Sequence, residues 1–294
     1  MAAVQRGKPI SLGLPMRSGQ GPIAGMRLPM QHFMSRDGGD YAAGLPEKPG
    51  YGYADDSIIV ACHGTTHLDA LSHVWRDGLM WNGYPASTVT SRGAARCGIE
   101  AAGPIVTRAL FLDLAVGAPL AEGEPISAAQ LDRAARDRGL IPAPGDSLLV
   151  RTGWLSQWRA SAATTTSWPG LDADCAEWLG GHDISVVGAD NIAVEVGPST
   201  VAGSALPLHL AAIRDRGIYF LELLDLEALA ASGARECLLM VAPLNIVGGV
   251  GSPVAPVAVV LRSQAPWPAA RDEHRVSSSG QADLLGLELY GQVF

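Results

Sequence analysis

Three histidines and an aspartate fall within eleven residues, and their spacing limits how this stretch of chain can fold. They are His63, His67, Asp69 and His73. On an α-helix, residue 69 would lie about 240° around the axis from residue 63, so one helix cannot direct these side chains to one point. On an extended chain they all leave one face, but the first and last would lie about 33 Å apart. The chain must therefore bend, and the segment Gly64-Thr65-Thr66 is a suitable place.

The residue types favour a catalytic metal site at this bend. Neutral imidazole and carboxylate groups suit Zn²⁺ or Mn²⁺. His63, His67 and Asp69 would leave coordination positions open for water and substrate, which is typical of catalytic sites. Water activated by such a metal is a nucleophile near neutral pH, and His73 is close enough in sequence to act as a general acid or base. A single histidine is more often a hydrogen-bonded surface or core residue, but four such residues of one parity rarely arise by chance.

Composition excludes several classes of protein. The chain has 294 residues, of which 48% are hydrophobic and 17% charged, as in an ordinary globular enzyme. Its net charge is −8 and its Lys and Arg residues form no cluster, so we expect a small-molecule substrate and neither a nucleic-acid nor a membrane partner. It has no apolar run long enough for a signal peptide or a membrane helix, and we therefore expect a cytoplasmic protein. The four cysteines form no CxxC pair and are expected to be free thiols.

Strand and helix signals alternate in the middle of the chain, and strands dominate the rest. Ser127 is a predicted helix N-cap and Gly139 a predicted helix end. An Asn-Gly pair at 82–83 predicts a turn. Strands are expected at residues 56–62, 109–114, 146–152, 184–190, 218–224, 236–244 and 254–261, and helices at residues 128–138, 171–181 and 206–217. This pattern predicts a single mixed α/β domain.

The two ends of the chain differ from this pattern. Residues 13–55 are rich in Gly, Pro and Met and show no clean period, so they are predicted to be a long loop arm that wraps a neighbouring subunit or covers a pocket. We expect a catalytic domain over residues 1–262 that includes this arm. We also expect the protein to form a homodimer or a homotetramer. Residues 263–294 are predicted to be a tail that is disordered or that docks on the body or on a second subunit.

The histidine segment resembles the signature of the bacterial cyclase family, which includes bacterial kynurenine formamidase, isatin hydrolase and a dienelactone hydrolase. That signature is His, three residues, His, one residue, Asp, and a His four residues further on, which falls on residues 63–73 without a gap. Further blocks that resemble the family lie at residues 69–83, 148–154, 186–195, 206–226 and 242–260. The resemblance covers roughly residues 10–262 and implies the family's α/β domain of swivelling β/β/α-like type.

The resemblance also implies further metal ligands. In family members with two metals, a later His and Glu bind the second ion and the signature Asp bridges both; these match His209, Glu222 and Asp69. The predicted helix and strand could bring His209 and Glu222 together. Two departures weaken any transfer of substrate preference: Leu71 stands where the family often has Pro, and Leu223 where it often has Asn.

The implied activity is metal-dependent hydrolysis of an amide or lactone bond in a small cyclic or aromatic compound, with one or two Zn²⁺ or Mn²⁺ ions and with His73 as acid or base. Trp75, Trp81 and Trp154 could stack on a flat substrate, although they could equally be core aromatics. Phe33, in the N-terminal arm, could cover the pocket from a partner subunit.

Two alternatives remain open at this point. A biosynthetic cyclase or dehydratase acting on a polyketide-like or other secondary-metabolite intermediate would need the same metal, with an internal group attacking in place of water. A non-catalytic binding protein on the same fold would be free to lose at least one of the ligands, which this chain keeps. A serine hydrolase is excluded, because no GxSxG motif stands between a predicted strand and helix.

Overall fold

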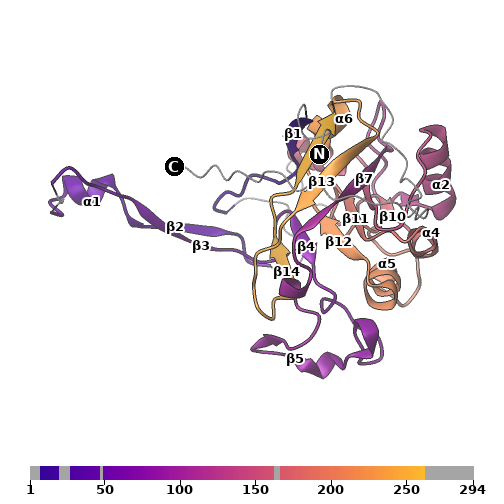
Figure 1. The fold of residues 1–294 in the computed structure, drawn as a ribbon, viewed down its shortest axis with the longest axis horizontal. Coiled ribbons are helices and arrows are strands. Elements are labelled where there is room, and N and C mark those ends of the chain that lie inside the picture. The colour runs from indigo at the N-terminus through magenta and orange to yellow at the C-terminus, as the bar shows by residue number, and fades with distance from the viewer. Residues whose placement is uncertain (1–6, 20–26, 47–48, 162–165, 262–294) are drawn as a thin grey trace, which may run out of the picture. The chain divides into compact units, whose positions relative to one another are not determined.

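A nine-stranded mixed sheet forms the centre of the structure (Figure 1), a computed structural model that describes residues 7–19, 27–46, 49–161 and 166–261. The strand order is β1-β15-β13-β7-β9-β11-β12-β4-β14. The four strands β7, β9, β11 and β12 run parallel, whereas the pairs toward either edge are antiparallel. The predicted tail, residues 263–294, lies outside the described residues, and Met1–Arg262 forms one compact unit.

The strands of this sheet lie mostly where apolar runs predict them. The run at 146–152 becomes β9 and the run at 184–190 becomes β11, both buried on two faces as is usual in parallel sheets. In sheet order the strands are β1 Gly7–Ser11, β15 Val257–Leu261, β13 Glu236–Val241, β7 Ile105–Asp113, β9 Ser147–Arg151, β11 Val186–Ala189, β12 Tyr219–Glu222, β4 His67–Asp69 and β14 Gly251–Pro253.

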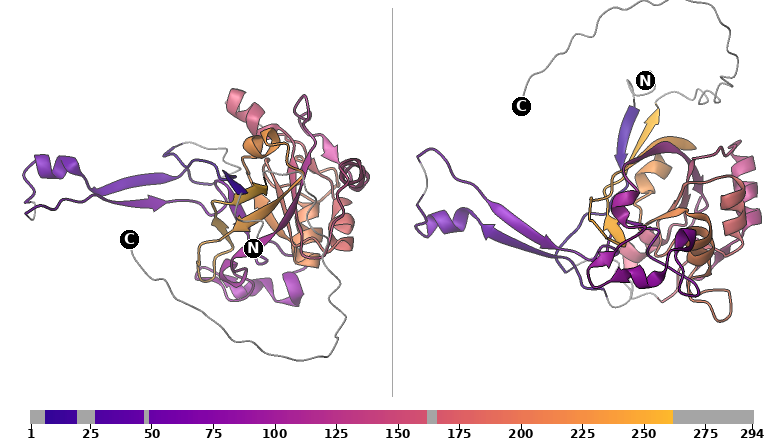
Figure 2. Two further views of the ribbon diagram at one scale, coloured as in Figure 1. Left: turned by 45° about the horizontal axis from the view of Figure 1, so that its top comes forward. Right: turned by 60° about the horizontal axis from the view of Figure 1, so that its bottom comes forward.

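Helices connect the parallel strands, and they are visible beside the sheet in Figure 2. The helix α2 (Ala128–Asp137) begins at the predicted cap, where Ser127 and Gln130 bond each other's backbone N–H groups in a capping box. It is followed by Gly139, whose φ of 64° suits a glycine at the end of a helix. The other helices are α3 Trp154–Ser161, α4 Cys175–Gly181, α5 Pro207–His209 with its π-helical continuation η5 Leu210–Arg214, and α6 Glu227–Ala231.

Two hydrophobic cores lie on opposite faces of the sheet. Along β7, Leu110 and Leu112 belong to one core, which also holds the buried residues of α2 and α4. Ala109 and Phe111 belong to the other core, together with Leu68 of β4. This alternation follows from the two-residue period of a strand. The mixed α/β fold predicted from the sequence is therefore confirmed.

The N-terminal arm differs from its prediction. A loop was expected over residues 13–55, but the chain forms an antiparallel hairpin of β2 (Gln31–Arg36) and β3 (Asp55–Ile59), with the short helix α1 (Gly38–Ala42) between them (Figure 1). The strand β2 escapes sequence analysis because the adjacent residues Phe33 and Met34 place apolar side chains on both of its faces, so no alternating pattern is present. The strand predicted at 56–62 corresponds to β3 but is wrong at its end, since β3 stops at Ile59.

Smaller elements fill the remaining connections. The predicted Asn-Gly turn is confirmed, with φ of 58° at Asn82 and 74° at Gly83. These elements are η2 Trp81–Gly83, η3 Ala86–Thr88, β5 Val89–Thr90, β6 Gly93–Ala94, η4 Ile99–Ala101, β8 Pro125–Ile126 and β10 Gly170–Leu171. Among the described residues, none of the helices has both the length and the apolar character that a membrane span requires.

Candidate metal centre

The histidine segment bends twice around the short strand β4. Before the strand, the N–H of Gly64 donates to the carbonyl of Ala61 over 2.9 Å; after it, the N–H of His73 donates to Ala70, also over 2.9 Å. Within β4, His67 and Asp69 leave the same face, while Leu68 enters the hydrophobic core on the other. The predicted bend at residues 64–66 is thus present, and a second bend follows the strand.

Two further segments bring an acid and a histidine to this face. Glu222 ends β12 and is the direct cross-strand partner of His67. His209 ends α5, the helix that precedes β12 in the chain. The Nε2 of His209 lies 3.4 Å from Oε1 of Glu222 and 3.7 Å from Oδ2 of Asp69. The structure therefore brings together all the residues that the family resemblance implies as ligands.

Asp69 lies at the middle of this group and is fully buried. Its Oδ1 is 3.2 Å from Nε2 of His63 and 3.3 Å from Nε2 of His67. It belongs to two sets of three potential ligands, one with His63 and His73 and the other with His67 and Glu222, and the ligand atoms of each set lie within 4.8 Å of one another. An aspartate shared in this way could bind two cations or one.

Four polar atoms of this group have no hydrogen-bond partner among the described residues, although all four are buried. They are Nε2 of His63, Nε2 of His67, and both carboxylate oxygens of Asp69. A buried polar atom without a partner costs about 1–3 kcal/mol, and more when the group is charged. Such atoms converging on one point fit a bound cation, which would satisfy all of them at once.

Neighbouring backbone groups orient the ligand rings. The Nδ1 of His67 lies 2.7 Å from the carbonyl oxygen of Thr65. A carbonyl only accepts, so Nδ1 is the donor and Nε2 is the nitrogen available to a metal. Gly251 of β14 pairs with Asp69, and a Cβ at Gly251 would stand 2.4 Å from Nε2 of His63. A glycine is therefore required at this position for the ring of His63 to keep its place.

The charges of this group shift one another's pKa values. Burial alone would raise the pKa of Asp69, but the surrounding histidines hold it well below its usual range. Burial alone would lower the pKa of His67, yet the carboxylates of Glu222 and Asp69 raise it. Burial alone would also raise the pKa of Glu222, but its neighbours, mainly His67, lower it. The histidines thus lower the pKa of both carboxyl groups although both are buried, and this favours the charged form that a cation site requires.

His73 stands beside the ligands. Its ring stacks on that of His63, with centroids 4.2 Å apart, and lies 6.2 Å from the ring of His209. Burial lowers the pKa of His73 to about 4, against the opposing charge of Asp69. The position is compatible with the predicted acid–base role, and it also makes His73 a potential ligand, a role that the sequence did not predict.

Comparison with known proteins identifies the family. The model of the Cyclase family matches residues 10–196. The chain belongs to this family. A crystal structure of a novel cyclase is 35% identical, covers 88% of this chain and 89% of its own, and superimposes with a TM-score of 0.80. The cyclase resemblance of the histidine segment is therefore confirmed.

Two more distant structures share the fold. An isatin hydrolase bound to the product analogue thioisatinate is 20% identical, with a TM-score of 0.67 and coverage of 87% of this chain and 94% of its own. A potential metal-dependent hydrolase with cyclase activity is 17% identical, with a TM-score of 0.57 and coverage of 86% and 99%. No curated protein matches this cyclase-family chain.

A turn over residues 191–195, here called the 191–195 turn, supports two of the potential ligands, and sequence reasoning missed it. Ala193 and Val194 have φ of 73° and 58°, a region that non-glycine residues rarely adopt and that often marks functional sites. The N–H of Ala193 donates to Oε2 of Glu222 over 2.9 Å. Glu195 accepts a hydrogen bond from Nδ1 of His209. The sequence pointed to this turn only through the family-like block at 186–195, and that resemblance assigned no role to Ala193 or Glu195.

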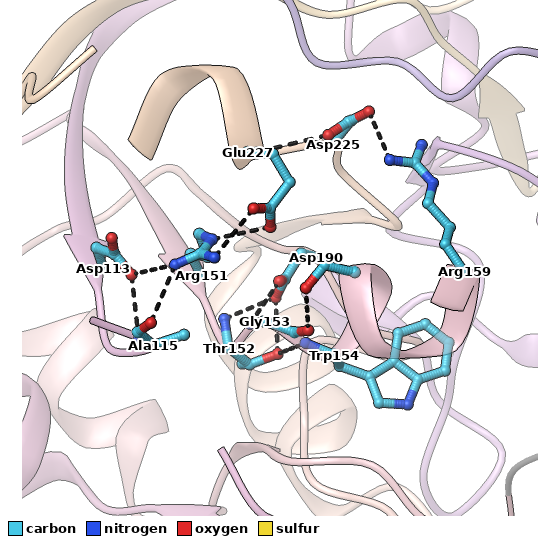
Figure 3. A network of polar contacts seen from close by, with 11 residues as sticks. Asp113, Ala115, Arg151, Thr152, Gly153, Trp154, Arg159, Asp190, Asp225 and Glu227 are labelled. Atoms are coloured by element: carbon cyan, nitrogen blue, oxygen red, sulfur yellow. Dashed lines mark hydrogen bonds and ion pairs between the residues drawn. The ribbon is translucent and has the colours of Figure 1, made fainter. Parts of the chain in front are cut away.

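The cyclase-family chain holds another buried carboxylate directly before this turn. Asp190 follows β11 and accepts three hydrogen bonds, from the N–H and hydroxyl of Thr152 and from the N–H of Gly153, over 2.7–2.8 Å (Figure 3). Burial raises the pKa of Asp190 to about 6, although these hydrogen bonds oppose the shift. The contacts join the end of β11 to the end of β9.

The aromatic residues predicted to line a substrate pocket lie in different surroundings. Trp154 is 2% exposed and belongs to a small apolar cluster with Leu223, next to Glu222. Trp81 is half-buried, and a Cβ at Gly217 would come within 2.8 Å of its ring. Trp75 and Phe33 are about half exposed, at 49% and 50%. Their contact with a substrate stays a prediction.

Proposed function

We propose that the chain is a metal-dependent hydrolase that opens an amide or lactone bond in a small cyclic or aromatic compound. The observation that carries the proposal is the convergence of four partnerless buried atoms of His63, His67 and Asp69. Hydrogen bonds within the described chain do not explain why these atoms are held away from water. A bound divalent cation would explain it, because it would contact all four atoms. A family of metal-dependent enzymes supplies the expected chemistry.

His63, His67, Asp69, His209 and Glu222 would hold the metal. Three imidazoles and two carboxylates suit Zn²⁺ or Mn²⁺, and the sharing of Asp69 between two ligand sets supports a site for one or two ions. When bound, the metal would polarise a substrate carbonyl and lower the pKa of a water molecule.

The chain's own residues then have separate tasks. His73, whose ring stacks on that of His63, would take the proton of the attacking water and pass it to the leaving amine or alcohol. Asp69, enclosed by histidines, would stay ionised throughout. Because His63, His67 and Asp69 are at most 9% exposed, the side chains around them would exclude bulk water from the reacting groups.

The proposed substrate class draws on the structural relatives. One of them is an isatin hydrolase bound to thioisatinate, and another is described as a hydrolase with cyclase activity. The relative with cyclase activity and the cyclase at 35% identity together support an alternative function. In this alternative the chain is a cyclase or dehydratase, and an internal group of the substrate attacks in place of water. A non-catalytic binding protein is disfavoured, because every potential ligand is present and directed to one point.

A hydrolysis assay decides between these functions. Purified protein loaded with Zn²⁺ or with Mn²⁺ is tested on cyclic amides, lactones and N-formyl aromatic amines, with Asp69→Ala as the inactive reference. The proposal predicts turnover that a chelator abolishes and the same metal restores. Stoichiometric metal without hydrolysis of any of these compounds would favour the cyclase, and failure to bind metal would contradict both enzymes.

We also propose that the hairpin of β2 and β3 docks on a second copy of the chain. All residues of β3, and all of β2 except Arg36, are exposed. Phe33 and Ile59 stand on one face of the hairpin, and Met34 and Ile58 on the other. A two-stranded hairpin is marginally stable in water, so an apolar surface on each face needs cover, and an identical chain is always present to give it.

A further inference from the structure

Glu195 makes three hydrogen bonds with the residues around a single proposed ligand. Its Oε1 accepts from the backbone N–H of His209 over 3.1 Å and from Nδ1 of the same residue, while its Oε2 accepts from the N–H of Leu208 over 3.0 Å. The side chain is 2% exposed. One carboxylate therefore binds the start of α5 and the ring that this helix carries.

These contacts determine which nitrogen of His209 can face a metal. A carboxylate only accepts, so the proton on Nδ1 is the one donated to Glu195. The other nitrogen, Nε2, is directed at Asp69 and Glu222. Ligand histidines in metalloproteins are commonly oriented in this way by a carboxylate or carbonyl on the far nitrogen.

The position of Glu195 is itself fixed by the 191–195 turn. The amide of Asn191 donates to the carbonyls of Pro169 and Val194 over 2.6 and 3.2 Å. These bonds hold the turn in the left-handed conformation of Ala193 and Val194. The same turn donates its Ala193 N–H to Glu222, so it contacts two of the proposed ligands at once.

We propose that Glu195 is a positioning residue, which holds the ring of His209 with Nε2 toward the metal and thereby sets the affinity of the centre. The proposal rests on the proposed metal-dependent function. A residue that only capped the start of α5 would accept from the backbone N–H groups of Leu208 and His209 and would not bond the ring. The bond to Nδ1 adds control of the ring, and only this bond links Glu195 to metal affinity.

Asp190 provides a matched control for a test by substitution. It is also a buried carboxylate that accepts from two backbone N–H groups and one side-chain donor, but its donors belong to Thr152 and Gly153 rather than to a proposed ligand. Glu195→Ala and Asp190→Ala each remove the whole carboxylate. Each variant therefore leaves two backbone N–H groups and one side-chain donor without their acceptor.

The experiment measures the Zn²⁺ affinity of the wild type and both variants by competition with a chromophoric chelator, together with the unfolding temperature. We expect Glu195→Ala to weaken the affinity about 10–100-fold. Asp190→Ala should change it less than about threefold while lowering the unfolding temperature. Equal affinity in Glu195→Ala and the wild type, or equal weakening in both variants, would overturn the role of Glu195. A wild type that binds no Zn²⁺ would overturn the proposed function as well.

A second measurement decides the matter if Glu195→Ala does not fold. In the wild-type protein loaded with Zn²⁺, nitrogen-15 NMR of the histidine rings is expected to show a proton on Nδ1 of His209 and coordination through Nε2, the signal being assigned by its loss in His209→Gln. Coordination through Nδ1, or a ring without the Nδ1 proton, would overturn the proposal.

Discussion

The candidate metal centre and the N-terminal hairpin violate the usual division between interior and surface in opposite ways. At the centre, polar atoms of His63, His67 and Asp69 are buried without hydrogen-bond partners among the described residues. On the hairpin, Phe33 and Ile59 are exposed to at least half of their surface. Each arrangement is costly for an isolated chain. The difference supports two different proposed occupants, a cation at the centre and an apolar protein surface on the hairpin.

The largest expected effect is at the centre. Asp69→Ala removes the carboxylate shared by both ligand sets, so we expect loss of metal binding and of hydrolysis to the background rate. Metal content and turnover are measured on the same preparation. The control is Asp56→Ala, which removes an exposed acid of the hairpin that pairs with His32 and should leave both quantities unchanged. Turnover that persists in metal-free Asp69→Ala would refute the mechanism.

The next effect concerns the hairpin and should leave the centre intact. The double substitution Phe33→Ser and Ile59→Ser removes the apolar residues of one face, so the proposed oligomer should dissociate, with a dissociation constant raised at least about tenfold, as a loss of about 1.4 kcal/mol would give. Light scattering coupled to gel filtration measures the mass. Ile141→Ser, at an 80% exposed residue outside the hairpin, is the matched control. A wild type that is monomeric at all concentrations would contradict the proposed docking.

A third effect distinguishes two of the tryptophans that were predicted to contact substrate. Trp154 is buried in an apolar cluster, so Trp154→Ala should lower the free energy of unfolding by about 3–5 kcal/mol. Trp75 is half exposed, and Trp75→Ala should lower it by less than about 1 kcal/mol. Urea denaturation measures both. If Trp75→Ala instead raises KM without changing stability, its predicted contact with substrate gains support; similar stability losses in the two variants would contradict the difference in burial.

The last expected effect is a pH dependence. Burial raises the pKa of Asp190 to about 6, above the ordinary value of an aspartate, so the folded chain binds this proton more tightly than the unfolded chain does. The free energy of unfolding should therefore fall as pH rises from about 4 to about 6, by on the order of 2 kcal/mol from this group. In Asp190→Asn this part of the pH dependence should be missing. Identical pH profiles for the two proteins would contradict the shift.

Much of the centre could be predicted from the sequence because its first three proposed ligands are close together. The spacing of His63, His67 and Asp69 excludes a helix and requires a bend, and β4 lies between two such bends. His209 and Glu222 could be assigned only by resemblance, since a histidine in a helix and a glutamate in a strand are unremarkable on their own. Glu195 was missed because its role depends on a contact with a residue 14 positions away, which no local pattern contains.

The fold shows the same division between local and long-range signals. Buried runs such as those of β9 and β11 were found because such runs are strongly apolar. The strand β14 was missed because it consists of Gly251, Ser252 and Pro253, and its pairing with β4 outweighs the weak strand propensity of these residues. The strand β2 and its pairing with β3 were missed because neither face of this hairpin is buried against the body of its own chain.

The central claim is that the group around Asp69 binds a divalent cation. Anomalous diffraction from crystals of the wild-type protein grown with Zn²⁺ or Mn²⁺ tests it most directly, because it locates the ion as well as detecting it. The account predicts one or two peaks at coordination distance from Asp69, with His67 and Glu222 among the ligands. Peaks only elsewhere on the molecule, with the histidine rings of this group engaged in hydrogen bonds alone, would contradict it.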